Sequence, residues 1–264
     1  MAMVGATPRN SWHAGSEGID LVRGRPASRR LAVAAQPVPV VLDLTRTACV
    51  VIDMQNDFCA EGGWLSYVGV DVSPARAPIE PLARLLPALR AADVPVIWLN
   101  WGNRPDRANL PPGVLHVYDP DGTGIGIGGA LPRSGSHVLE KGSWSAAVVD
   151  GLEVAASDVR VDKYRMSGFF DTELDSVLRN LDVSTVLFAG VNLDQCVLAT
   201  LTDAACIGYD VVLLEDCCAT TSPGFCVEAT IYNVRQCFGF IALGDDLGSA
   251  LAHASGAARG PGAQ

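Results

Sequence analysis

Three side chains that could together carry out hydrolysis stand at the ends of three separate apolar segments. Asp53 ends the run 48–53, Lys163 ends a shorter run, and Cys196 follows the run 184–189 at the start of an apolar helical pattern. A thiol at the start of a helix lies near unpaired backbone N–H groups, which favour the thiolate and can hold an oxyanion. A neighbouring carboxylate and ammonium could exchange its proton and stabilise its charge. The combination predicts nucleophilic catalysis by Cys196.

Each of these groups also has an ordinary structural interpretation. The chain has eight cysteines, and a free cysteine is often only a small buried hydrophobe. Asp53 could cap the segment after it, and Lys163 could be a solvated strand end. Three such groups at three strand ends are harder to explain in this way than any one of them. We expect no metal site, because no CxxC pair occurs, and no need for disulfides in a core of this size.

The elements that must position these groups are predicted from the alternation of strand-length apolar runs with helical patterns. Parallel strands joined by helices form a sheet covered on both faces, so the sequence predicts an α/β, three-layer Rossmann-like fold with six mostly parallel strands. Ligands bind outside the carboxyl ends of such strands, which places Asp53, Lys163 and Cys196 on one rim. Strands are expected at 48–53, 94–100, 159–163, 184–189, 209–215 and 238–243, and helices at 75–92, 172–181, 196–207 and 224–236.

Composition and charge narrow the class of partner. A net charge of −10 argues against binding to a phosphate backbone, and no apolar run reaches the roughly 18 residues that a membrane helix needs. We therefore expect a small-molecule substrate, no nucleic acid and no membrane. One domain is predicted over 41–252, between a poorly ordered extension at 1–40 and a flexible tail at 253–264. Residues 28–35 faintly resemble a twin-arginine export signal, but a glutamine and two prolines interrupt the apolar stretch at 36–39, so a cytoplasmic location is expected.

The segments around the three groups carry a family resemblance. Residues 51–58 (VIDMQNDF), 163–170 (KYRMSGFF) and 190–197 (GVNLDQCV) are similar to the motifs of the isochorismatase-like cysteine hydrolase superfamily, in the same order and at fitting separations over 45–245. The resemblance implies a six-stranded parallel sheet, the triad Asp53, Lys163 and Cys196, and a homo-oligomer, either a dimer or a tetramer.

The resemblance also implies details of the turn before the nucleophile. It places a cis peptide between Val191 and Asn192, and it makes the N–H groups of Asn192 and Cys196 the oxyanion hole. The sequence departs from the family here, because Asn192 and Leu193 stand where small residues or threonine are usual. This difference bears on the substrate more than on the chemistry.

The activity implied is that of a metal-independent cysteine amidohydrolase, which cleaves a C–N bond of a small ureido, biuret-like or cyclic amide substrate through a thioester. Residues 141–144 and 165–170 look like ureidoacrylate amidohydrolases, whereas 77–81 and 104–106 look like biuret hydrolases. Streptothricin hydrolases, which open an antibiotic lactam, share the chemistry and are one alternative. A non-catalytic member that binds a ligand in the same cleft is another.

Two neighbouring activities fit the sequence less well. Nicotinamidases carry an Asp and His cluster that binds a metal after the second strand, and residues 98–104 here contain no such ligands. True isochorismatases work without a cysteine nucleophile, so Cys196 argues against that activity.

The long irregular stretch 102–140 is expected to act as a loop or lid, since connections of this length are often functional. Its glycine-rich part, 122–129, resembles a dinucleotide fingerprint but does not join a strand to a helix, so no cofactor is expected.

The substrate pocket is predicted to include three aromatic residues and two polar ones. Phe58, Trp101 and Trp144 could form its wall, although ordinary packing explains aromatic residues equally well. Asn103 and Arg165 could hydrogen-bond a substrate carbonyl or carboxylate. Arg165 could instead pair with an acidic neighbour.

Overall fold

The computed structural model describes residues 2–24 and 26–257, and a seven-stranded sheet forms its centre. The strand order is β5-β12-β11-β10-β7-β8-β9, with β5 antiparallel to β12 and the other six strands parallel. The predicted mostly parallel α/β sheet is therefore confirmed, with one additional edge strand. The strands are β5 (Ala35–Gln36), β7 (Thr47–Ile52), β8 (Val96–Trp101), β9 (Val159–Lys163), β10 (Thr185–Gly190), β11 (Asp210–Cys218) and β12 (Phe240–Ala242).

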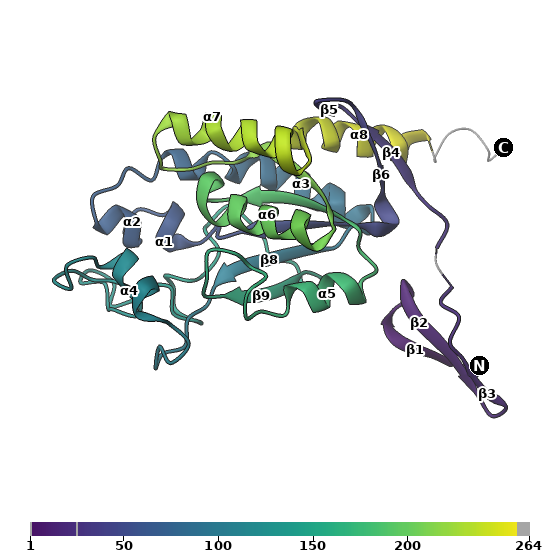
Figure 1. Ribbon diagram of the computed structural model, residues 1–264, viewed down its shortest axis with the longest axis horizontal. Coiled ribbons are helices and arrows are strands. Elements are labelled where there is room, and N and C mark those ends of the chain that lie inside the picture. The colour runs from purple at the N-terminus through teal and green to yellow at the C-terminus, as the bar shows by residue number, and fades with distance from the viewer. Residues whose placement is uncertain (1, 25, 258–264) are drawn as a thin grey trace.

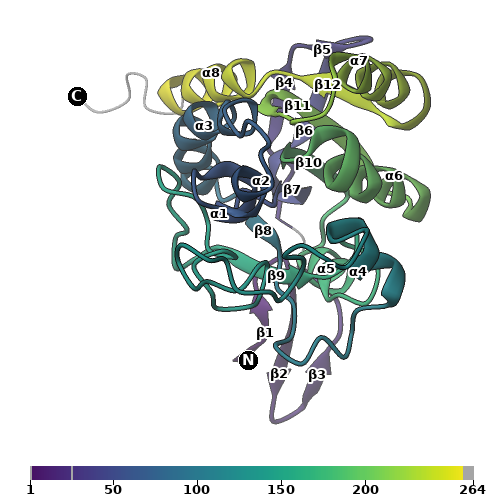
Figure 2. The ribbon, with the colours of Figure 1, turned by 90° about the vertical axis from the view of Figure 1, so that its left-hand side faces the viewer.

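Helices cover both faces of the sheet, as Figure 2 shows in a view along the strands. Helices α3 and α8 lie together on one face, and α5, α6 and α7 lie on the other. None of the described helices is long and apolar enough to cross a membrane. The helices are α1 (Asn56–Cys59), α2 (Trp64–Tyr67), α3 (Ile79–Ala91), α4 (Pro112–Tyr118), α5 (Leu174–Asn180), α6 (Leu198–Ile207), α7 (Gly224–Asn233) and α8 (Gly244–Ala257).

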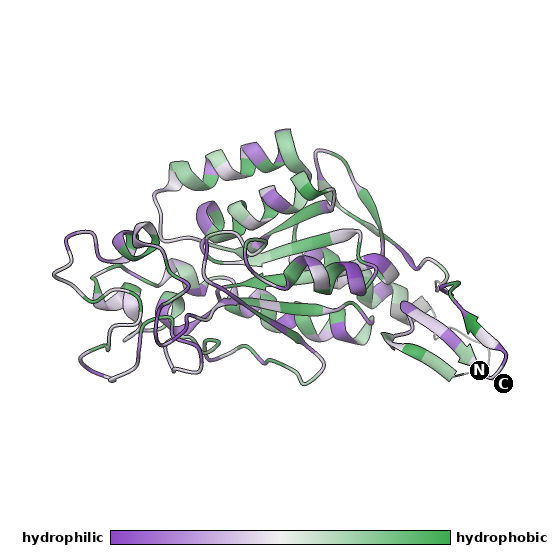
Figure 3. Cartoon of the chain, turned by 60° about the horizontal axis from the view of Figure 1, so that its bottom comes forward, coloured by the Kyte–Doolittle hydropathy of each residue, from purple (hydrophilic) through white to green (hydrophobic). Residues whose placement is uncertain are grey.

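The core lies between these layers, where the central strands are mostly apolar (Figure 3). All six residues of β7 are buried, which is the pattern of a parallel strand covered on both sides. Gly190 lets β10 end close against β7: its φ is +115°, and a Cβ there would lie 2.0 Å from the Ile52 carbonyl oxygen. This close approach brings the turn that carries Cys196 beside the strand that carries Asp53.

The region 1–40, predicted as a poorly ordered extension, contains several strands where the structure describes it. Strands β1 (Ala2–Thr7), β2 (Asn10–Gly15) and β3 (Gly18–Asp20) form an antiparallel sheet that projects from the end of the molecule opposite α1, α2 and α4 (Figure 1). Further along, β4 (Arg30–Val33) pairs with β6 (Val40–Asp43), and β5 joins the main sheet. The alternation of buried Leu31 and Val33 with exposed neighbours is a strand pattern that the polar, proline-containing composition conceals.

The predicted tail at 253–264 also differs from the structure where it is described. Helix α8 continues to Ala257, and the rest of the tail lies outside the described residues. The long stretch 102–140 is irregular as expected, except that it contains helix α4.

Candidate active site

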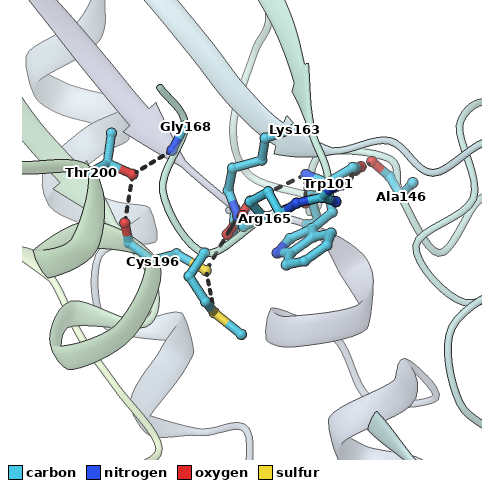
Figure 4. A network of polar contacts seen from close by, with 10 residues as sticks. Trp101, Ala146, Lys163, Arg165, Gly168, Cys196 and Thr200 are labelled. Atoms are coloured by element: carbon cyan, nitrogen blue, oxygen red, sulfur yellow. Dashed lines mark hydrogen bonds and ion pairs between the residues drawn. The ribbon is translucent and has the colours of Figure 1, made fainter. Parts of the chain in front are cut away.

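Asp53, Lys163 and Cys196 meet at the carboxyl edge of the sheet. Asp53 follows β7, Lys163 ends β9, and Cys196 lies in the turn after β10. The Lys163 Nζ lies 2.8 Å from Asp53 Oδ2. It also lies 3.2 Å from Cys196 Sγ and donates to the Arg165 carbonyl at 3.1 Å (Figure 4). The side chain of Lys163 is fully buried, so its charge is compensated within the site by the carboxylate.

Burial controls the protonation of the two acidic groups. It raises the pKa of Asp53 above its usual value, an effect that the nearby Lys163 ammonium opposes. Burial likewise raises the pKa of Cys196 to about 12, while Lys163 lowers it and Asp53 adds to the increase. This direction is opposite to the expectation that the helix start would favour a thiolate.

The backbone and ring of Trp101 support the triad. Its N–H donates to Asp53 Oδ1 at 3.2 Å and to Gln55 Oε1 at 2.9 Å, and its ring centroid lies 4.2 Å from Lys163 Nζ. The Gln55 amide donates in turn to the carbonyls of Trp101, at 2.8 Å, and Ala146, at 2.7 Å. Trp101, expected as a pocket wall, therefore also positions Asp53 and Lys163. Gln55 was not predicted, although its place two residues after Asp53 was a signal.

The turn before Cys196 is held by backbone hydrogen bonds. A cis peptide joins Val191 and Asn192, as the resemblance implies. The Asn192 carbonyl accepts from the N–H groups of Gln195, at 3.0 Å, and Val197, at 3.2 Å. Across the described residues, no acceptor is found for the Asn192 N–H, which leaves it available for the predicted oxyanion role.

The start of α6 is fixed from the side of β9. Thr200 Oγ1 donates to the Cys196 carbonyl at 2.7 Å and accepts from the Gly168 N–H at 3.1 Å (Figure 4). A hydroxyl that bonds the carbonyl four residues earlier is a common arrangement in helices. Here it ties the nucleophile's turn to the segment after Lys163.

The predicted substrate contacts fall into different environments. Asn103 is fully buried, and neither its Oδ1 nor its Nδ2 has a partner among the described residues. Arg165 binds the carbonyls of Asn109 and Tyr164 and lies 3.3 Å from Asp171, so it pairs with an acidic neighbour as the alternative interpretation held.

The two remaining aromatic candidates differ in exposure. Phe58 is buried in α1, within the hydrophobic core. Trp144 is 45% exposed and borders a surface depression lined by residues 134–137 and 140–143.

Sequence reasoning missed three residues near the triad. Met166 Sδ lies 3.7 Å from Cys196 Sγ, and its position three residues after Lys163 was a usable signal. Tyr118 and Trp64 pack against each other with ring centroids 4.8 Å apart, and Tyr118 also contacts Trp101 at 5.7 Å. Tyr118 lies in the long stretch, where no periodic pattern indicates which side chains turn inward.

Potential metal ligands are dispersed over the described part of the chain. Among residues 2–24 and 26–257, no cluster of three or more His, Cys, Asp or Glu side chains is arranged to hold a metal ion.

The sequence is similar to a known protein family and to named relatives. The family model "Isochorismatase domain" matches residues 47–246. The ureidoacrylate amidohydrolase RutB of Rhizobium rhizogenes is 34% identical over 229 residues, which cover 86% of this chain and 92% of that protein. The RutB of Agrobacterium fabrum is 35% identical over 226 residues, covering 85% and 98%.

Solved structures agree with the fold. A cysteine hydrolase from Pseudomonas syringae pv. phaseolicola 1448A aligns with a TM-score of 0.68 and 26% identity, covering 88% of this chain and 99% of that one. The N-carbamoylsarcosine amidase from Thermoplasma acidophilum aligns with a TM-score of 0.56 and 24% identity, covering 76% and 97%, and shares the fold.

Proposed function

The chain belongs to the isochorismatase family as an amidohydrolase of C–N bonds other than peptide bonds, and we propose that it hydrolyses a small ureido compound through a thioester on Cys196. The observation that carries the proposal is the placement of the buried Lys163 ammonium between Asp53 and Cys196. The names of the two RutB relatives support the ureido class. Biuret-like compounds and cyclic amides, including the lactam of streptothricin-type antibiotics, present the same kind of bond and are the alternatives.

In the first step, Asp53 accepts the Sγ proton as Cys196 attacks the substrate carbonyl carbon. The proton transfer is needed because the buried thiol has a pKa of about 12. Lys163 stabilises the negative charge that develops on sulfur, from 3.2 Å away. The carbonyl oxygen becomes an oxyanion, for which the N–H groups of Asn192 and Cys196 are the proposed donors.

In the second step, Asp53 returns the proton to the leaving nitrogen and the C–N bond breaks. Loss of ammonia from a ureido group leaves a thiocarbamate on Cys196. Asp53 then takes a proton from water, the hydroxide attacks the carbonyl carbon, and the sulfur leaves and regains a proton. The products are ammonia and a carbamate, and Asp53, Lys163 and Cys196 return to their starting states.

Two polar groups without a hydrogen-bond partner among the described residues could pair with the donors and acceptor of a ureido group. Asn103 offers one acceptor and two donors, and the Trp101 indole N–H is also buried without a partner among the described residues. A ureido group presents one carbonyl acceptor and several N–H donors. We propose that Asn103 Oδ1 accepts from a substrate N–H, since a buried unpaired amide costs about 1–3 kcal/mol and pairing on binding recovers it.

A substrate panel tests the proposal. Purified protein is incubated with 3-ureidopropanoate, biuret and a simple lactam, and release of ammonia or ring opening is followed. We expect turnover of the ureido compounds and a loss of at least about 10⁴-fold in Cys196→Ala. The matched control is Cys206→Ala, which removes an exposed thiol on α6 and leaves turnover unchanged. Acid quenching followed by mass spectrometry locates the adduct on Cys196, and full turnover by Cys196→Ala would refute the mechanism.

A further inference from the structure

A series of aromatic contacts connects Tyr118, in the long stretch 102–140, with Lys163 of the triad. It ends α4, and its side chain is 8% exposed. Its ring lies 4.8 Å from that of Trp64 and meets the ring of Trp101 edge-on, at 5.7 Å and an angle of 72°. Trp101 in turn covers the Lys163 ammonium at 4.2 Å. The contacts therefore lead from a loop helix to the catalytic lysine.

No described residue forms a hydrogen bond with the hydroxyl of Tyr118, and this oxygen is not among the fully buried polar atoms although the ring is buried. The Asp57 carboxylate accepts from other donors, through Oδ1 from the Trp64 N–H and through Oδ2 from the Leu139 N–H. Burial raises the pKa of Tyr118 well above its usual value, and the carboxylates of Asp53 and Asp57 raise it further. The group is thus a neutral O–H with a free donor, on a ring that contacts Trp101 beside the site.

The segment that carries Tyr118 is fixed on both sides. Before α4, Arg165 donates to the Asn109 carbonyl at 2.9 Å. After α4, the Trp64 indole donates to the Ile125 carbonyl at 2.7 Å, and Asp57 holds the end of the stretch through Leu139 at 2.8 Å. A donor held in this way is pre-organised, so little entropy is lost when a ligand pairs with it.

We propose that Tyr118 determines specificity by donating a hydrogen bond to an acceptor oxygen of the substrate that lies beyond the scissile C–N bond. The inference rests on the proposed function and narrows it to ureido compounds that carry a second carbonyl or a carboxylate. A substrate that covers the hydroxyl without offering an acceptor leaves it unpaired, and such mismatches produce strong discrimination. Tyr118 contacts the part of the substrate that does not react.

Two substrates that differ in this one feature provide the test. 3-Ureidopropanoate carries a carboxylate beyond its ureido group, and propylurea has the same ureido group without it. In Tyr118→Phe, which keeps the ring contacts, we expect kcat/KM for 3-ureidopropanoate to fall about 10- to 100-fold, mainly through KM. The value for propylurea should stay within about twofold. Biuret and methylurea form a second pair, with a carbonyl as the acceptor.

Controls separate this role from a structural one. Tyr232→Phe removes an exposed hydroxyl on α7 and should change neither substrate. An equal loss for both members of a pair, or an unchanged preference in Tyr118→Phe, would overturn the inference while the proposed function stands. If the wild-type protein turned over no member of either pair, the proposed function would fail and the inference with it.

Discussion

The carboxyl edge of the sheet and the stretch 102–140 that lies against it are built in different ways. At the sheet edge, Asp53, Lys163 and Cys196 adjoin parallel strands that pair along their length with other strands. The stretch lacks such a ladder and is tied to other parts of the chain by single contacts, among them those of the Trp64 indole and the Asp57 carboxylate and the backbone hydrogen bond from Gly102 to Lys163. The groups proposed to react therefore stand at the ends of paired strands, and the residues proposed for recognition stand largely on a connecting stretch.

This difference indicates how the two regions should respond to mutation. Loss of a triad group should abolish the reaction and leave the position of the loop intact. Loss of a loop contact should weaken substrate binding and loosen the loop, with the triad still assembled. Turnover therefore reports on the sheet edge, and substrate affinity together with proteolytic resistance reports on the loop.

The largest effect is expected at the sheet edge, from Lys163→Met. The change keeps most of the side-chain volume but removes the ammonium that lies 2.8 Å from Asp53 and 3.2 Å from Cys196. The developing thiolate loses its counter-charge, and we expect kcat/KM for a ureido substrate to fall by about 10³-fold or more. Lys141→Met is the matched control, because this lysine is 69% exposed. Activity within tenfold of wild type would show that the ammonium does not support the reaction.

The sequence predicts the sheet edge far better than the loop. Asp53, Lys163 and Cys196 could be placed together because the carboxyl ends of parallel strands share one rim, and each strand has a clear apolar pattern. Tyr118 could not be placed, since the inward direction of a side chain in an irregular stretch depends on tertiary contacts. Its partner Trp64 lies more than fifty residues earlier in the chain.

The raised pKa of Cys196 and the N-terminal strands were not predicted from the sequence, for related reasons. The position of a thiol at a helix start is visible in the sequence, but its burial is not, and burial dominates its pKa. Strand β5 comes from a segment whose composition suggests disorder, and its pairing is with β12, about two hundred residues later. Such pairing is a property of the fold rather than of the local sequence.

A smaller effect is expected in the loop, from Asp57→Asn. The Asp57 carboxylate accepts from the Leu139 N–H at 2.8 Å and from the Trp64 N–H at 3.0 Å, and an amide can accept through one oxygen only. We expect the free energy of unfolding to fall by about 1–3 kcal/mol, KM to rise, and proteolytic cleavage within 104–138 to become faster. Asp106→Asn is the control, since Asp106 is exposed and pairs with Arg104. Unchanged cleavage would show that Asp57 does not anchor the loop.

The smallest effect is expected on the free energy of unfolding at alkaline pH. It concerns the sheet rather than the loop, because 102–140 contains no cysteine. Burial raises the pKa of Cys49, in β7, to about 12, above the usual 9.0 that applies in the unfolded chain. Between these values the unfolded state loses its proton first, so the stabilisation present below pH 9 is lost as pH rises toward 12.

The same direction applies to Cys59 and Cys196, whose pKa values burial also raises to about 12. Each thiol should lower the free energy of unfolding by about 1 kcal/mol between pH 9 and pH 10. Urea unfolding at pH 8, 9 and 10 measures the slope, and Cys49→Ala should make it shallower by that amount because the variant lacks one of the buried thiols whose pKa is raised. An equal slope in the variant would mean that Cys49 titrates alike in the folded and unfolded states, and that the sheet is more open at β7 than its complete burial indicates.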